Sequence, residues 1–146
     1  MFILAGAAIS WRSHQQSTVA LSSMESEFIA LSEAAQETLW LRRLLDDFGI
    51  HQTETTLLQE DNQSCIMFVG SERIYQRSKH IATKEMFVKD LCEKGIIQLK
   101  YLCSEEMIAD ALTKPLGTVK IRKHSRKMGL VDAQFLDATV EIKEEY

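Results

Sequence analysis

The segment SSMESEFIALSEAAQETLWLRRLLDDFG, residues 22–49, begins with a serine and a glutamate at the spacing of a helix capping box. Ser22 and Glu25 are three positions apart, so their side chains can satisfy amides that are otherwise free at a helix start. Apolar residues then recur at helical spacing, at positions 28, 31, 35 and 39, and Gly49 suits the residue that follows a helix. The segment therefore predicts one long helix that begins after Ser22 and ends before Gly49.

Strand-like segments alternate with helices along the rest of the chain. Residues 2–10 and 17–22 are predicted to form two strands of a hairpin, with WRSHQQ (11–16) as the turn. Further along, we expect a strand at 55–61, helices at 62–69 and 80–94, a strand at 96–102, a helix at 104–114 that stops before Pro115, and a basic helix at 118–128. Residues 71–79 are expected to form an exposed basic loop. This alternation is typical of the α/β class.

Length and composition indicate one globular domain. The chain has 146 residues, of which 45% are hydrophobic and 26% charged. Its net charge of −4 argues against a strongly cationic nucleic-acid coat. The three cysteines lack metal-ligand spacing, which argues against a zinc site. Their odd number, without a recognisable signal peptide, suggests a reducing, intracellular compartment, cytoplasmic or nuclear. The apolar run MFILAGAAIS (1–10) is too short to span a membrane, and we expect a buried strand and no membrane association.

Three carboxylates on separate elements suggest a cation site. Glu27 lies near the start of the long helix, Asp61 follows the strand at 55–61, and Asp110 lies within the helix expected at 104–114. Mg²⁺ takes oxygen ligands and keeps several waters, so a few carboxylates from different elements suffice to bind it. The carboxyl end of a strand, where Asp61 lies, is also where open α/β sheets hold ligands.

Each acid also has a purely structural interpretation. Glu27 could complement the helix dipole, and Asp61 could cap the helix that follows it. Asp110 could form an ordinary helical ion pair with Lys114, four residues later. The residues alone leave both interpretations open.

Four segments together resemble the ribonuclease H domain of copia-type retrotransposon Pol polyproteins. They are WRSHQQSTVALSSMESEFIALSEAAQETLWLRRLL (11–45), EDNQSCI (60–66), RSKHI (77–81) and EEMIADALTKPL (105–116), in that order and spacing. Each piece is weakly specific by itself, but the ordered set is highly specific. The resemblance covers residues 5–131, which are assigned to an incomplete ribonuclease H-like domain at 1–131, and residues 132–146 are assigned to a C-terminal extension.

The resemblance implies a ribonuclease H-like mixed sheet flanked by helices and a Mg²⁺- or Mn²⁺-dependent nuclease. Members of the family hydrolyse the RNA strand of RNA–DNA hybrids with two ions held by four acids. Motif by motif, three of these acids fall on Glu27, Asp61 and Asp110. Such a hybrid is recognised by backbone shape and 2′-hydroxyls rather than by base sequence. The cations expected to face its phosphates, with an ordinary solvated surface as the alternative, are Arg73, Arg77, Lys79, Arg12 and His14.

The chain departs from the family pattern at two places. The family's fourth acid belongs to a segment resembling GYxDADWAGD on the first, central strand, and no counterpart is present. We expect the central gap to be filled by direct strand pairing, by a strand swapped from a second copy, or in trans by the missing segment or the reverse transcriptase domain. In RSKHIAT, Ala82 stands where the family often has an acid.

Two functional hypotheses follow from the match and its departures. The first is a metal-dependent ribonuclease H that needs its first strand in trans or works poorly with three acids. The second is a non-catalytic transposon remnant that binds nucleic acid or protein, or has no function.

Overall fold

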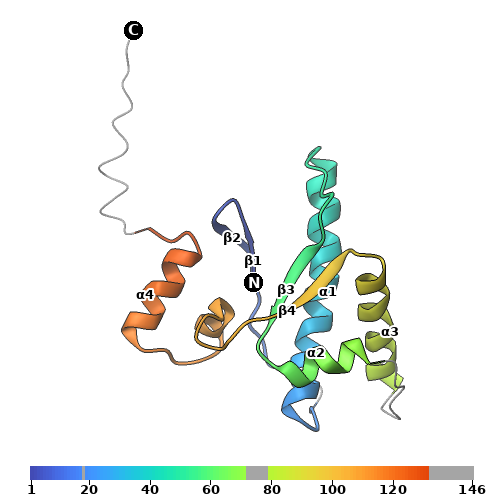
Figure 1. Cartoon of the computed structure of the whole chain (residues 1–146). Coiled ribbons are helices and arrows are strands. Elements are labelled where there is room, and N and C mark those ends of the chain that lie inside the picture. Colours follow the sequence, from blue (N-terminus) through green and yellow to red (C-terminus); the bar gives the residue numbers. More distant parts are fainter. Residues whose placement is uncertain (18, 72–78, 132–146) are drawn as a thin grey trace. The chain divides into compact units, whose positions relative to one another are not determined.

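The computed structural model describes residues 1–17, 19–71 and 79–131, with the side chains of residues 79 and 80 outside the description. Contacts divide the chain into two compact units, coloured along the sequence in Figure 1. Among the described residues, the sheet unit comprises those within 16–107, and the hairpin unit comprises 1–15 and 108–131. Within the described residues, four α-helices and two two-stranded sheets place the chain in the α/β class, as predicted. None of the helices in this part of the chain is long and apolar enough to cross a bilayer.

The sheet unit is built on a parallel strand pair. Strands β3 (Thr56–Glu60) and β4 (Ile97–Tyr101) pair in register along their whole length. Between them the chain passes through helices α2 (Gln63–Gly70) and α3 (Lys79–Glu93), because parallel strands need a long crossover. The predicted strands and helices of this region are confirmed to within a residue or two. As a consequence, β3 and β4 end side by side.

The long helix α1 (Ser23–Asp47) is confirmed, with the predicted limits. The hydroxyl of Ser22 accepts a hydrogen bond from the amide of Glu25 at 3.2 Å. The Glu25 carboxylate accepts from the amide of Leu21 at 2.8 Å, one residue earlier than a standard capping box requires. At the other end Gly49 adopts a positive φ of 76°, which closes the helix.

Helices α1, α2 and α3 cover one face of the β3–β4 pair and form the core with it. The rings of Phe28 and Phe68 join α1 to α2 edge to face, with centroids 5.0 Å apart. Along β3, Leu58 and Glu60 are buried, whereas Leu57 and Gln59 are exposed, so alternate residues face the helices. The buried apolar side chains are Phe28, Ile29, Leu31, Ala35, Leu41, Leu58, Cys65, Phe68, Val69, Ile81, Val88, Leu91 and Ile97.

The hairpin unit begins with an antiparallel pair, β1 (Phe2–Leu4) and β2 (Ala7–Ser10). The predicted hairpin of residues 2–10 with 17–22 is therefore wrong. Ala5 and Gly6 both have positive φ, as a tight two-residue turn requires, so residues 2–10 fold back on themselves. Between residues 19 and 22 the chain forms no strand and leads into α1 instead.

The rest of the described hairpin unit contains two short helices. Residues 108–112 form a 3-10 helix, η1 (Ile108–Leu112), where an α-helix over 104–114 was expected, so that prediction is also wrong. Pro115 disfavours helical backbone at the residue before it, which keeps this segment short. The basic helix is confirmed as α4 (Thr118–Lys127), and the amide of Ala8 donates to the carbonyl of Met128 just after it, at 2.9 Å.

Replacing the cap of α1 tests how much of the helix start depends on one hydroxyl. We expect Ser22→Ala to lower the free energy of unfolding by about 1 kcal/mol, because the Glu25 amide loses its acceptor. The matched control is Ser23→Ala, one residue later, which should change the free energy by less than about 0.5 kcal/mol. Urea unfolding of both variants gives the comparison, and equal effects would contradict the capping role.

Candidate metal centre

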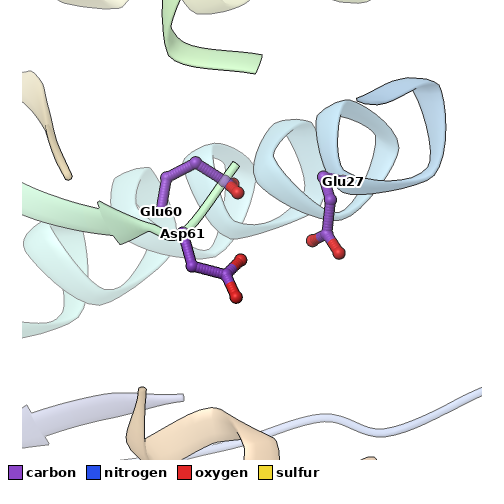
Figure 2. Close-up of side chains that lie close together, drawn as sticks. All are labelled: Glu27, Glu60 and Asp61. Carbon is purple, nitrogen blue, oxygen red and sulfur yellow. The ribbon is translucent and has the colours of Figure 1, made fainter. Parts of the chain in front are cut away.

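Three carboxylates meet where β3 ends. Glu27 comes from the start of α1, Glu60 is the last residue of β3, and Asp61 follows it directly. One carboxylate oxygen from each residue lies within 4.8 Å of the other two (Figure 2). We refer to these three side chains as the acid cluster.

The strand pattern explains why Glu60 belongs to the acid cluster. Alternation along β3 turns Leu58 and Glu60 toward the helices, so the Glu60 carboxyl is buried beside the α1 face that carries Glu27. Asp61 lies one residue beyond the strand and is half-buried. The cluster therefore forms at the carboxyl end of a parallel strand, the usual ligand-binding end of such sheets.

Asp61 does not cap α2, so its structural interpretation is wrong. The cap is Asn62, whose side-chain oxygen accepts a hydrogen bond from the amide of Cys65 at 3.2 Å. The Asp61 carboxylate instead accepts a hydrogen bond from the hydroxyl of Ser104, at 2.7 Å. Its position is therefore set by the segment after β4 rather than by the helix that follows it.

The electrostatics of the cluster are unfavourable without a cation. Burial raises the pKa of Glu60 from 4.5 to about 7, and repulsion by Glu27 and Asp61 adds to the shift. The amide of Asn62 donates to the Glu60 carboxylate at 2.9 Å and partly offsets it. Burial and the charges of Glu60 and Glu27 also raise the pKa of the Cys65 thiol to about 12, so this thiol stays protonated.

The donor set fits a hard divalent cation. Carboxylate oxygens are the ligands that Mg²⁺ and Mn²⁺ prefer, and Mg²⁺ keeps several of its waters. A bound cation would neutralise the repulsion that raises the pKa of Glu60. The acid cluster therefore offers carboxylate oxygens from three residues as candidate ligands for a divalent cation.

Asp110 lies in the hairpin unit, within η1, and is buried. Its carboxylate forms an ion pair with the Lys114 ammonium at 2.7 Å, which confirms the i,i+4 structural interpretation. The described acid cluster contains Glu27 and Asp61 of the three predicted ligands. A metal role for Asp110 stays a prediction.

The predicted phosphate contacts are only partly described. Arg73 and Arg77 lie outside the described residues, and so does the side chain of Lys79, the first residue of α3. Arg12 and His14 are exposed in the segment after β2. All five stay predictions.

Sequence reasoning missed Glu60. The signal was present in the period of two along β3, which places positions 56, 58 and 60 on one face. A glutamate at the third of these positions is a buried acid if the strand faces a core. The neighbouring Asp61, by contrast, is the acid of the DNQS motif that resembles the family.

Comparison with known proteins identifies the relatives of this sequence. Over 130 residues, 89% of its length, the chain is 35% identical to the retrovirus-related Pol polyprotein from transposon TNT 1-94 of Nicotiana tabacum. It is 30% identical over 84% of its length to the corresponding polyprotein from transposon RE2 of Arabidopsis thaliana. The chain is homologous to part of a copia-type retrotransposon Pol polyprotein. It covers 10% and 8% of these two relatives.

Other comparisons add little to the Pol homology. A segment of 41 residues, 28% of the chain, is 61% identical to secreted RxLR effector protein 161 of Plasmopara viticola and covers 29% of that protein. No protein-family model matches this chain, and no solved structure matches it. The homology therefore shows that the chain is related to Pol polyproteins, and it does not identify which domain of the polyprotein the chain corresponds to.

The raised pKa of Glu60 predicts a pH-dependent stability of the Pol homologue in the absence of divalent ions. In the native chain Glu60 keeps its proton up to about pH 7, whereas the unfolded chain releases it near 4.5. The native state binds more protons between these values, so the free energy of unfolding falls as pH rises through them. Glu60→Gln removes this loss and should stabilise the chain at pH 8, but not at pH 4.

The expected gain at pH 8 is about 1 kcal/mol, because burial causes most of the shift and solvent around the half-buried Glu27 and Asp61 screens the repulsion that adds to it. Urea unfolding with a chelator present, at pH 4, 6 and 8, measures it. Glu93→Gln, an exposed change on α3, is the control and should show no such trend. A Glu60→Gln effect that is independent of pH would contradict the burial of this carboxyl.

Proposed function

We propose that this chain is a ribonuclease H-type domain that uses Mg²⁺ or Mn²⁺ to hydrolyse the RNA strand of RNA–DNA hybrids. The observation that carries the proposal is the convergence of Glu27 and Asp61, from two separate elements, on the acid cluster. Homology to Pol polyproteins of retrotransposons supports it, and so does the ordered set of motifs that resembles the ribonuclease H domain. Asp110 is the third proposed ligand.

Each acid has a defined part in the proposed reaction. Glu27, Asp61 and Asp110 would hold the divalent ions, which when bound would supply the Lewis acidity for water attack on the phosphodiester and for stabilising the leaving oxygen. Glu27 and Asp61 supply oxygen ligands from a rigid helix and a strand end, so the geometry exists before substrate binds. When its carboxyl is ionised, Glu60 adds negative charge beside them and strengthens the attraction for a cation.

The proposed substrate is a hybrid duplex held through its phosphates. Arg73, Arg77, Lys79, Arg12 and His14 are the proposed phosphate contacts, a sequence-independent mode that suits a nuclease acting on any hybrid. The proposed fold is the ribonuclease H-like sheet, of which the parallel β3–β4 pair would be one part. Because a two-stranded sheet is marginal by itself, we expect full activity to need a further strand, from another Pol segment or a second copy.

Hybrid cleavage is the direct test of the proposal. A purified chain should cut labelled RNA annealed to DNA when Mg²⁺ is added and should stop when a chelator is added. Asp61→Asn should reduce the rate at least about a hundredfold, since loss of single catalytic groups costs orders of magnitude. Asp47→Asn, the same change at the exposed end of α1, is the control and should retain the wild-type rate.

The same assay separates the two hypotheses about this chain. Cleavage that persists in Asp61→Asn comes from a contaminating nuclease and would contradict the proposal. Binding of the hybrid without cleavage at any Mg²⁺ or Mn²⁺ concentration, measured by fluorescence anisotropy, would instead support a non-catalytic nucleic-acid-binding module. Adding the remaining Pol segments in trans tests whether the chain lacks only a strand.

Asp110 requires its own experiment, because it already has a structural partner. Asp110→Asn removes both a proposed ligand and the ion pair with Lys114, whereas Lys114→Gln removes the ion pair alone. We expect hybrid cleavage to be lost in Asp110→Asn, by at least about a hundredfold, and to be kept in Lys114→Gln. Equal rates in the two variants would show that Asp110 serves the ion pair only.

A further inference from the structure

We propose that Ser104 is a positioning residue that holds the Asp61 carboxylate for cation binding, an inference that rests on the metal site proposed above. Its hydroxyl donates a hydrogen bond to Asp61 Oδ2 at 2.7 Å. The two residues are 43 positions apart in the sequence, so the contact exists only when β3 and β4 are paired. Ser104 belongs to none of the proposed ligands or phosphate contacts.

Pairing of β3 with β4 places Asp61 and Ser104 at the same end of the strand pair. The β3–β4 ladder runs to the last residue of each strand, Glu60 opposite Tyr101. The amide of Leu102 then donates to the carbonyl of Glu60 at 3.0 Å, which continues the pairing past the end of β4. Asp61 and the segment that carries Ser104 therefore leave the sheet side by side. The hydroxyl reaches the carboxylate because of this register.

A neutral donor suits this position better than a cation would. Repulsion within the acid cluster favours rotamers that carry Asp61 away from Glu27 and Glu60. The serine hydroxyl opposes this movement without cancelling the charge, and it occupies one of about four lone-pair positions of the carboxylate. The remaining positions are available to a metal ion. Asp110, by contrast, is held at the same distance of 2.7 Å by the charged Lys114, which competes with a cation.

The test measures Mn²⁺ binding to the full 146-residue chain by electron paramagnetic resonance, which reports free Mn²⁺ directly. We expect Ser104→Ala to raise the Mn²⁺ dissociation constant about tenfold, because residues that orient ligands typically contribute this much to metal affinity. Ser104→Thr keeps the hydroxyl and should restore the affinity to within about twofold of wild type. The Mg²⁺ midpoint of hybrid cleavage should rise in parallel, with the KM for hybrid unchanged.

Thr55→Ala is the matched control, because it removes another hydroxyl that links the flanks of β3 and β4. Thr55 donates to the carbonyl of Gly95, also at 2.7 Å, at the opposite end of the strand pair from the acid cluster. A loss of affinity through general destabilisation would appear in this variant too, whereas a positioning role predicts wild-type Mn²⁺ binding.

The outcomes separate this inference from the proposed function. Wild-type binding that Asp61→Asn weakens and Ser104→Ala leaves unchanged would overturn the role of Ser104 and leave the metal site standing. Equal losses in Ser104→Ala, Ser104→Thr and Thr55→Ala would also overturn it. No Mn²⁺ binding by the wild-type chain would overturn the metal site and the positioning role together.

Discussion

The parallel pairing of β3 with β4 is the constraint on which the candidate site depends. It fixes the level at which β3 ends, and so the place where Glu60 and Asp61 leave the sheet. It also delivers Ser104 to Asp61 through the additional bond from Leu102 to Glu60. A slip of one residue would turn Glu60 to the exposed face of the strand, because side chains alternate with a period of two. The cluster would then be lost although each acid remained in the sequence.

Helix α1 supplies the other half of the site, and it packs against β3 as well as against α2 and α3. Its start is capped by Ser22, and Phe28 anchors its first turns against Phe68 of α2. Glu27 precedes that anchor by one residue and therefore lies on a packed part of the helix start. A ligand on a packed helix and another at a strand end keep their separation without help from a bound ion, which is the preorganisation that a metal site requires.

Local sequence patterns predicted most elements of the sheet unit. The features that they did not predict depend on contacts between residues far apart in the sequence. The limits of α1, the two paired strands and the cap spacing at Ser22 follow from neighbouring residues, so the sequence was sufficient. The strand expected at 17–22 failed because its apolar residues never met a partner: Val19 and Leu21 are 88% and 91% exposed. The contact of Ser104 with Asp61 spans 43 residues and follows from strand register, which no local motif encodes.

At position 60, the packing of the core favours an apolar side chain, yet the residue is a glutamate of the acid cluster. An apolar residue at position 60 would complete the buried face that Leu58 continues, whereas a carboxyl there must be desolvated close to two other acids. The hydrogen bond from the Asn62 amide offsets only part of this cost, since the pKa of Glu60 is still raised to about 7. Where packing alone would favour a hydrophobic side chain, a strained carboxyl points to a role outside stability. The proposed attraction of a cation is a role that Glu60 could share with Glu27 and Asp61, whose carboxylate oxygens lie close to its own.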